Sequence, residues 1–186
     1  MFLKATESST LMEQLFFCFD AKCSLTTCSL DDHRFHCSML RPGTIKVGKE
    51  GITFFPASIW LIFHYLRIFS NPSYSVFVIY NKDLLVHRSH VFPPYFRFPF
   101  MAERDIQIGD TWTHPDFRGH GLATFALFEI VRRYSSSNLC IWYVVEETNL
   151  SSVKVATKVG FSLIGKGTRT KKFGLSLFGQ YIVDPY

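Results

Sequence analysis

The segment Arg118–Ala123 (RGHGLA) carries the residue types from which proteins build an anion site. Its two glycines, Gly119 and Gly121, let main-chain N–H groups approach a phosphate without an intervening Cβ. Arg118 adds a positive charge beside them. If a helix begins here, its first N–H groups lack partners within the helix, and the helix dipole favours an anion. This spacing predicts a phosphate cradle.

The segments on either side of the turn supply the strand and the helix that such a cradle requires. Residues 105–113 (DIQIGDTWT) alternate as a strand does, and residues 124–134 form an apolar run typical of a helix. The turn lacks the Lys-Ser or Lys-Thr pair of a Walker loop and the G-x-G-x-x-G spacing of a dinucleotide-binding turn. Taken alone, the turn therefore also fits a plain helix start that binds no ligand.

A second strand and helix extend this pattern. The strand is expected at 138–146, and the helix runs from Asn149 to Gly160-Phe161. The order strand, R-x-x-G-x-A, helix, strand, N-x-x-S, helix, Gly-Phe resembles the GNAT superfamily of acyl-CoA-dependent N-acyltransferases. Residues 113–118 (THPDFR) fit the V-x-P-x-x-R lead-in of that family, with threonine in place of valine. The resemblance covers residues 105–167, about a third of the chain.

The resemblance implies an α/β fold with a mixed, mostly antiparallel sheet, splayed central strands and flanking helices. It also implies an N-acetyltransferase that moves an acetyl group from acetyl-coenzyme A to a primary amine of a small molecule, sugar or peptide. A length of 186 residues suits one domain with a substantial core. We therefore expect a single GNAT-like domain over residues 1–186, with a divergent segment at 1–40 and the cofactor-binding core at 105–167.

The resemblance assigns the coenzyme to the strand end, the glycine turn and the second helix. Backbone groups around Asp110–Thr113 should meet the pantetheine arm and the acyl carbonyl, and the turn should hold the pyrophosphate. Asn149 sits where the family contacts the pantetheine or the leaving sulfur, although asparagine is also a favoured helix N-cap. The expected cofactor-binding residues are Asp110, Thr111, Trp112, Thr113, Arg118, Gly119, His120, Gly121, Leu122, Ala123, Asn149 and Ser152.

Acyl transfer to an amine also needs a base that removes a proton from the amine. Five residues near the central strand could act as this base, although each also fits an ordinary surface or hairpin position: His87, His90, Glu103, Asp105 and Asp110. We favour Asp105, because alternation places it opposite the apolar Ile106 and Ile108, with its carboxylate toward the cleft. The expected catalytic set is Asp105, Glu103, His87 and Asn149.

One position departs from the family pattern. Many relatives carry a tyrosine seven residues after the asparagine, as an acid for the departing thiolate, and this chain has Ala156 there. Protonation would then fall to water or another group, and a non-catalytic acyl-CoA-binding module remains an alternative. His87 and His90 lie three residues apart in a strand and so face opposite sides, which argues against a metal site.

Composition and charge narrow the partners. The chain is 47% hydrophobic and 17% aromatic, which excludes intrinsic disorder. Its net charge of +5 is concentrated in residues 154–172, and we interpret this as attraction for a phosphorylated cofactor. No RRM, zinc-finger or helix-turn-helix pattern supports a nucleic-acid partner. The five cysteines are odd in number and lack a C-x-x-C pair, so they predict reduced thiols in a cytoplasmic protein without a secretory signal.

The segment 52–69 is the most apolar part of the chain, but Pro56, His64 and Arg67 interrupt it. Helical spacing favours a core helix at 57–69, so membrane contact is not expected. An interfacial helix, as in a membrane-surface acyltransferase using longer acyl chains, remains the alternative.

Other segments give a coarse map. The aromatic loop 92–101 suits a sugar ring as well as a peptide, so an amino sugar is slightly favoured as the acceptor. The chain could also form a homodimer. The remaining expected elements are a helix at 8–19, a strand at 51–55, a hairpin of strands 74–80 and 84–91, and final strands at 161–167 and 175–183.

Overall fold

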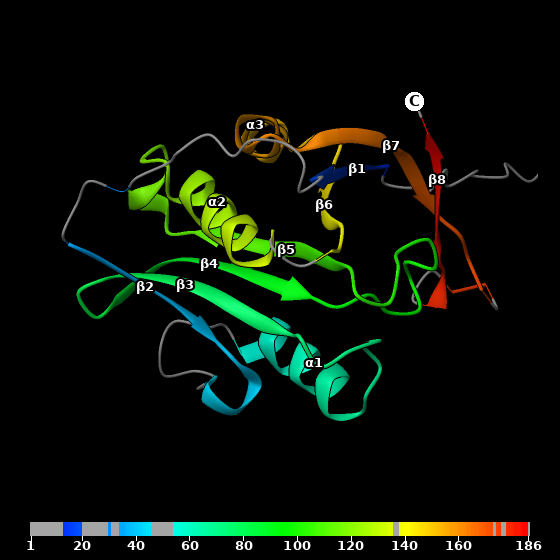
Figure 1. The fold of residues 1–186 in the computed structure, drawn as a ribbon, viewed down its shortest axis with the longest axis horizontal. Coiled ribbons are helices and arrows are strands. Elements are labelled where there is room, and N and C mark those ends of the chain that lie inside the picture. The colour runs from blue at the N-terminus through cyan, green and yellow to red at the C-terminus, as the bar shows by residue number, and fades with distance from the viewer. Residues whose placement is uncertain are drawn as a thin grey trace, which may run out of the picture.

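Among the residues that the structure describes, eight strands form a mixed sheet with helices on both faces in the computed structural model (Figure 1). The described residues are 13–19, 30, 34–45, 54–135, 138–172, 174–175 and 178–185. The strands are β1 (Gln14–Phe19), β2 (Phe35–Leu40), β3 (Ser75–Asn81), β4 (Leu84–Phe92), β5 (Ile106–Thr113), β6 (Ile141–Glu146), β7 (Ser162–Arg169) and β8 (Tyr181–Pro185). The α-helices are α1 (Phe54–Tyr65), α2 (Leu122–Tyr134) and α3 (Leu150–Val159).

The N-terminal strand β1 joins the two ends of the motif region. The sheet order is β2-β3-β4-β5-β6-β1-β7-β8, so β1 lies between β6 and β7 and runs antiparallel to both. Phe16 of β1 pairs with Val144 on one side and Gly165 on the other. Strands β6 and β7, which flank helix α3 in sequence, are therefore connected in the sheet through the N-terminal segment.

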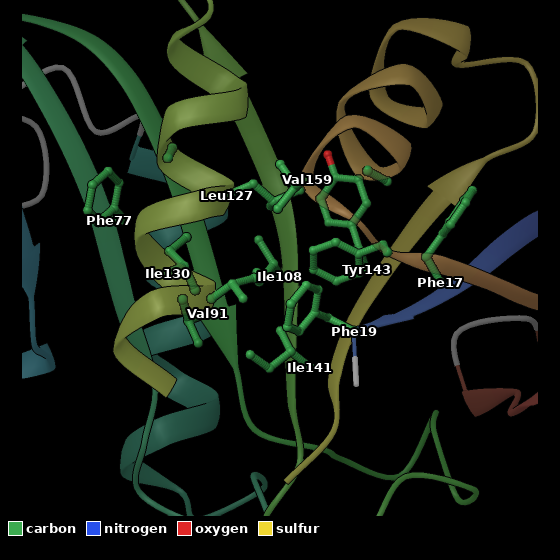
Figure 2. Packing of buried hydrophobic residues seen from close by; sticks show 14 of the residues in the cluster. Phe17, Phe19, Phe77, Val91, Ile108, Leu127, Ile130, Ile141, Tyr143 and Val159 are labelled. Atoms are coloured by element: carbon green, nitrogen blue, oxygen red, sulfur yellow. The ribbon is translucent and has the colours of Figure 1, made fainter. Parts of the chain in front are cut away.

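Each face of the sheet carries its own buried core. Helices α2 and α3 cover one face, where Leu127 of α2 and Val159 of α3 pack with Phe19 of β1 (Figure 2). Helix α1 lies against the other face, where Trp60 packs on Phe92 with ring centroids 4.4 Å apart. The apolar sequence of α1 is explained by this second core, to which the aromatic loop after β4 also contributes.

Strand β5 contains a bulge where it pairs with β4. Arg88 pairs with Trp112, but His90 pairs with Gly109, so β5 holds one residue more than β4 over this stretch. Asp110 lies in the bulge with a left-handed φ of 45°. Such a bulge bends its strand and redirects the side chains that follow it.

Strands β5 and β6 run parallel but pair over only a short stretch. Residues Ile106–Ile108 pair with Ile141–Tyr143, and both strands are described beyond these pairs, to Thr113 and Glu146. Because the ladder stops there, the two strands diverge toward their C-terminal ends. The main-chain groups of residues 109–113 on the β6 side consequently have no ladder partner in the sheet.

The structure confirms the predicted fold class, a mixed and mostly antiparallel sheet with diverging central strands and flanking helices. The hairpin and the strand–helix units of the motif region lie close to their expected positions. The helix expected at 8–19 is wrong over residues 14–19, which form β1, while residues 8–12 lie outside the described part. An unbroken apolar run such as QLFFCF fits a strand buried between two neighbours as well as a helix.

Two other boundaries also differ from the sequence prediction. Residues 54–55, expected in a short strand, begin helix α1, and this helix ends at Tyr65 rather than at residue 69. The last strand begins only at Tyr181, not at residue 175. None of the described helices combines the length and the apolar character that crossing a membrane would require.

The central position of β1 leads to a prediction about stability. Phe16 is fully buried and contacts the rings of Phe98, Phe100 and Tyr181. Phe16→Ala should lower the free energy of unfolding by about 3–5 kcal/mol, measured by urea denaturation, because it leaves a cavity beside these three rings. Phe178→Ala, at a side chain that is 47% exposed, is the control and should change it by less than about 0.5 kcal/mol. A small effect of Phe16→Ala would show that β1 is not an integral strand.

Candidate functional site

A cavity of about 670 Å³ lies where β5 and β6 diverge. Its walls are the end of β5, the glycine turn, the first turn of α2 and one side of α3. It brings together the residues expected to bind the cofactor, except Asp110 and His120. Its lining consists of Thr111, Trp112, Thr113, Phe117, Arg118, Gly119, Gly121, Leu122, Ala123, Thr124, Tyr143, Asn149, Ser151, Ser152, Lys154, Val155 and Lys158.

The glycine turn presents open main chain to this cavity. Gly119 and Gly121 have φ values of +81° and +78°, a conformation that side chains other than glycine rarely adopt. A Cβ built on either glycine would meet no atom within 4 Å, so the space above the turn is free. Gly121 is the N-cap of α2 and provides no side-chain cap, which leaves the first N–H groups of the helix available to an anion.

Arg118 and His120 both stabilise the conformation of the turn, and Arg118 also gives it a positive charge. Arg118 is exposed, and its Nε donates to the carbonyl oxygen of Thr113 at 3.2 Å. His120 is also exposed, and its Nδ1 lies 3.0 Å from the carbonyl oxygen of Arg118. Arg118 therefore ties the turn to the end of β5 while its positive charge remains beside the cavity.

The charged side chains that line the cavity all carry the same sign. The described lining residues include the cations Arg118, Lys154 and Lys158 and no carboxylate. A second cavity, of about 620 Å³, also carries cations, Arg41 and Arg133, but it lies at the C-terminal end of α2. The helix dipole is negative at that end and disfavours an anion. Position and dipole together make the cavity between β5 and β6 the stronger anion site.

Asn149 caps helix α3. Its Oδ1 accepts hydrogen bonds from the main-chain N–H of Ser152 at 3.1 Å and from the Ser151 hydroxyl at 2.8 Å. The N-cap interpretation of Asn149 is thus confirmed. The cap occupies only Oδ1, so the Nδ2 amide can still donate to a ligand in the cavity.

Asp105, the first choice as a base, does not face the cleft. It is 5% exposed, and its carboxylate accepts from the N–H groups of Ala102 and Cys140 at 2.9 and 3.0 Å and from the Trp142 indole at 2.9 Å. It does lie opposite Ile106, as alternation predicted, but that face is closed over by Trp142 and the loop before β5. The expectation that its carboxylate points into the cleft is therefore wrong.

Glu103 and His87 are also placed away from the open part of the site. Glu103 is exposed in the loop before β5, and its main-chain carbonyl accepts from Ser70 and Asn71. His87 is fully buried, and burial together with the nearby Arg88 lowers its pKa to about 3. The neutral imidazole of His87 can pass a proton along hydrogen bonds, but it is a poor proton acceptor.

A separate polar cluster surrounds Asp110 on the α1 face of the sheet. The Asp110 carboxylate lies 3.7 Å from the Arg88 guanidinium and 3.6 Å from Nε2 of His90, and it also accepts a hydrogen bond from Trp60. His90 is held by Tyr74, whose hydroxyl lies 2.9 Å from Nδ1. Burial raises the pKa of Asp110 above its usual value, and Arg88 opposes the rise. Its side chain is 29% exposed, so a ligand can reach it.

Sequence reasoning missed several lining residues. Tyr143 on β6 and Lys154, Val155 and Lys158 on α3 all contribute to the cavity. Alternation along β6 could have placed Tyr143 beside the motif, because Ile141, Tyr143 and Val145 share one face. Ala156, the position of the family tyrosine, is fully buried in the core beneath α3 and has no exposed surface.

Metal chemistry has no candidate site in the described part of the chain. No group of three or more His, Cys, Asp or Glu side chains gathers there in a way that could hold an ion. His87 and His90 point to opposite faces of β4, toward Ser89 and Tyr74 respectively, as the alternation predicted.

Comparison with known proteins adds independent findings. A model of the acetyltransferase (GNAT) family matches residues 52–161. A GNAT-family protein from Novosphingobium aromaticivorans is 12% identical with a TM-score of 0.51, over 83% of this chain and 61% of that one. A GNAT-family acetyltransferase from Colwellia psychrerythraea is 15% identical with a TM-score of 0.54, over 82% of this chain and 53% of that one.

A tandem GNAT protein from the clavulanic acid biosynthesis pathway is 13% identical with a TM-score of 0.55, over 83% of this chain and 51% of that one. At these identities the likeness shows the fold alone. The chain spans between about half and three fifths of the length of these three structures. A search of curated protein sequences found no match.

The hydrogen bonds of Asp105 predict a structural role. In Asp105→Asn, one acceptor oxygen becomes an amide donor that faces buried N–H groups. We expect the free energy of unfolding to fall by about 1–3 kcal/mol in urea denaturation. Glu103→Gln, at an exposed carboxylate two residues away, is the control and should stay within about 0.5 kcal/mol of the parent. Equal stability of the two variants would contradict the structural role.

Proposed function

Because the chain belongs to the acetyltransferase (GNAT) family, we propose that it transfers an acetyl group from acetyl-coenzyme A to a primary amine. The observation that carries the proposal is the cavity between β5 and β6. It combines an open glycine turn, an uncapped helix N-terminus and three cationic side chains. This combination suits a long anionic ligand whose phosphates bind at one end and whose reactive group enters between the strands.

Each part of acetyl-coenzyme A has a matching group in the cavity. The turn and the first N–H groups of α2 would hold the pyrophosphate, with Arg118, Lys154 and Lys158 beside the phosphates. The unpaired main chain of residues 109–113 would bind the pantetheine arm and orient the thioester. The Asn149 amide and Ser152 would contact the arm from the α3 side. Main-chain N–H groups of β5 would also stabilise the oxyanion that forms on the carbonyl.

The acceptor amine is proposed to approach from the α1 face. The amine must be neutral to attack the thioester carbonyl, and its nitrogen loses a proton as the N–C bond forms. Asp110 is the carboxylate that fits this role, since the bulge places it beside the strand opening and burial raises its pKa. Arg88 lies 3.7 Å from one of its oxygens, and Nε2 of His90 lies 3.6 Å from the other.

The surroundings of Asp110 bear on the class of acceptor. Trp60 donates to its carboxylate, and Trp112 lies under the Arg88 guanidinium at 5.6 Å. Aromatic rings beside an acid suit an amine carried on a ring, which keeps an amino sugar as the slightly favoured acceptor, with peptides and other small amines as alternatives. We also propose that residues 1–186 act as one domain, with 105–167 as its cofactor-binding core, in the cytoplasm.

One observation favours a second candidate function, a membrane-surface acyltransferase. Helix α1 exposes Ile59 and Ile62, 41% and 53% exposed, and Leu66 follows them with 67%. Such a surface suits contact with lipid, and the enzyme would then prefer longer acyl chains. Comparing acetyl-, octanoyl- and palmitoyl-coenzyme A as donors separates the two candidates, because the proposed acetyltransferase should favour the acetyl donor.

The glycine turn gives a direct test of coenzyme binding. Coenzyme A should raise the melting temperature of the protein, because it binds only the folded state. Gly121→Asp should abolish this rise, since its carboxylate would lie beside the phosphates. Gly121→Asn is the matched control, because asparagine has the same shape without the charge and also tolerates a positive φ. Equal shifts in both variants and the parent would contradict the placement of the pyrophosphate.

The proposed base gives a second test. Asp110→Asn should lower the turnover number about a hundredfold in an amine screen, with little change in coenzyme A affinity. Because the base must be unprotonated, activity of the parent should fall as the pH drops through the raised pKa of Asp110, and this acidic limb should be absent in the variant. Normal turnover in Asp110→Asn would remove it from the mechanism. If coenzyme A binds but no amine is acetylated by the parent, the chain is a binding module.

A further inference from the structure

Tyr143 carries a buried hydroxyl group in the cavity lining that the proposed function leaves unused. It comes from β6, on the opposite side of the strand opening from β5, and it lines the cavity although it is only 3% exposed. Its ring is anchored in the core, and its hydroxyl points toward α3 (Figure 2). There the hydroxyl forms hydrogen bonds with Ser152 on α3 and with Thr111 on β5. Tyr143 thus bridges the two walls of the cavity.

From Thr111, a chain of polar side chains runs across the face of the sheet that bears α2 and α3. The Thr111 hydroxyl lies 3.1 Å from the Ser89 hydroxyl, which lies 3.0 Å from Nε2 of His87. Nδ1 of His87 lies 2.8 Å from the Thr113 hydroxyl. With His87 protonated on Nε2, each group can donate to the next, from Thr113 through to Tyr143. All these side chains lie on the face that bears α2 and α3, and Thr113 lies in the cavity lining.

The transfer reaction needs a proton donor in this region. When the amine nitrogen bonds to the acetyl carbon, the C–S bond breaks and its electron pair leaves with sulfur as a thiolate. Serine and threonine hydroxyls are too weakly acidic to protonate a thiolate, whose ordinary pKa is about 8.5. A phenol, with an ordinary pKa of about 10, is closer. Lys154 and Lys158 also line the cavity, but both are exposed and are the groups proposed to lie beside the phosphates.

We propose that Tyr143 donates its proton to the departing thiolate and regains it through Thr111, Ser89 and His87. This inference rests on the proposed acetyl transfer. It supplies the proton donor that the alanine at position 156 cannot provide. In this proposal Tyr143 is the catalytic residue, because it lines the cavity in which the sulfur would lie. Ser89 and His87 act through it and are positioning residues.

The proton balance of the step closes. The amine loses one proton to Asp110 and then to water. Tyr143 gives one proton to sulfur, and its phenolate takes a proton from the Thr111 hydroxyl. Thr111 then takes a proton from Ser89, and Ser89 takes one from Nε2 of His87. His87 Nδ1 recovers a proton from Thr113 at the cavity, where water can restore it. The products are an N-acetyl amine and coenzyme A thiol, with no net change in the protein.

The local hydrogen bonds favour the phenolate that this step creates. Burial raises the pKa of Tyr143, so the hydroxyl keeps its proton at neutral pH and is ready to donate it. The hydrogen bonds from Ser152 and Thr111 oppose that rise, because they stabilise the phenolate once the proton has left.

Tyr143→Phe tests the proposal while keeping the ring that packs in the core. Binding of coenzyme A is measured first by its effect on melting temperature, which should match the parent within about twofold in affinity. The release of thiol from acetyl-coenzyme A is then followed with butylamine as the acceptor. The turnover number should fall at least about tenfold in the variant. Tyr134→Phe removes a tyrosine hydroxyl at the far end of α2 and should leave it unchanged.

A second measurement does not depend on turnover. The pKa of the thiol of bound coenzyme A is obtained from the ultraviolet absorbance of the thiolate as a function of pH. It should be about one unit higher in Tyr143→Phe than in the parent, because the thiolate loses a hydrogen-bond donor. Equal thiol pKa values and equal turnover numbers would overturn the inference while leaving coenzyme binding intact. Failure of coenzyme A to bind the parent would instead overturn the proposed function itself.

The relay is tested apart from the acid. Ser89→Ala interrupts the chain of side chains without changing the cavity lining. It should lower the turnover number severalfold and leave both coenzyme A affinity and the bound thiol pKa unchanged. Full activity in Ser89→Ala, alongside an impaired Tyr143→Phe, would overturn the relay and show that water returns the proton to Tyr143 directly.

Discussion

The divergence of β5 from β6 is the constraint on which the rest of the site depends. A parallel pair that stayed in register would bury its main-chain groups in the ladder and fill the space between the strands with side chains. Here the ladder ends after three residue pairs, and the bulge at Asp110 bends β5 just beyond that point. The opening exposes main chain to a ligand, and the glycine turn continues from the same strand to the N-terminus of α2.

The bulge also separates two chemical environments that lie next to each other in sequence. Thr111 turns to the face covered by α2 and α3 and joins the hydroxyl and imidazole groups behind the cavity. Asp110 turns to the α1 face, where Arg88, His90 and two tryptophans surround it. A thioester placed between the strands would have a proton acceptor on one side and a proton donor on the other. Neighbouring residues of a strand face opposite sides, and the extra residue of the bulge decides that Asp110 faces α1 while Thr111 faces α2 and α3.

The sequence predicted the parts of this fold that depend on local patterns. The glycine turn, the helices that follow each motif strand and the β3–β4 hairpin all have short-range signals, and the structure places them close to where these signals indicated. The strand β1 was predicted as a helix, because an apolar run of this kind can be identified as a strand only from the two strands that pair with it. No local pattern shows that a segment near the N-terminus will enter the sheet between β6 and β7.

The candidate site was likewise predicted only where its residues belong to local motifs. Residues of the turn and of the helix N-termini were found from motifs, because an anion cradle is a local structure. Asp105 was misjudged, because alternation gives the face of a side chain but not what covers that face, and here Trp142 does. Asp110 was one of five candidate bases but was ranked below Asp105, and Tyr143 was not singled out at all. The roles now proposed for them depend on a bulge and on a contact across the opening, which only the three-dimensional arrangement reveals.

The central claim is that the cavity between β5 and β6 holds the phosphates of a coenzyme A ester. The most direct measurement is an NMR titration of the isotope-labelled protein with coenzyme A, in which each main-chain amide is followed separately. The account predicts that the largest shifts occur at Gly119, Gly121, Leu122 and Ala123, followed by residues 109–113 of β5. Shifts concentrated instead around Arg41 and Arg133, at the second cavity, would contradict it.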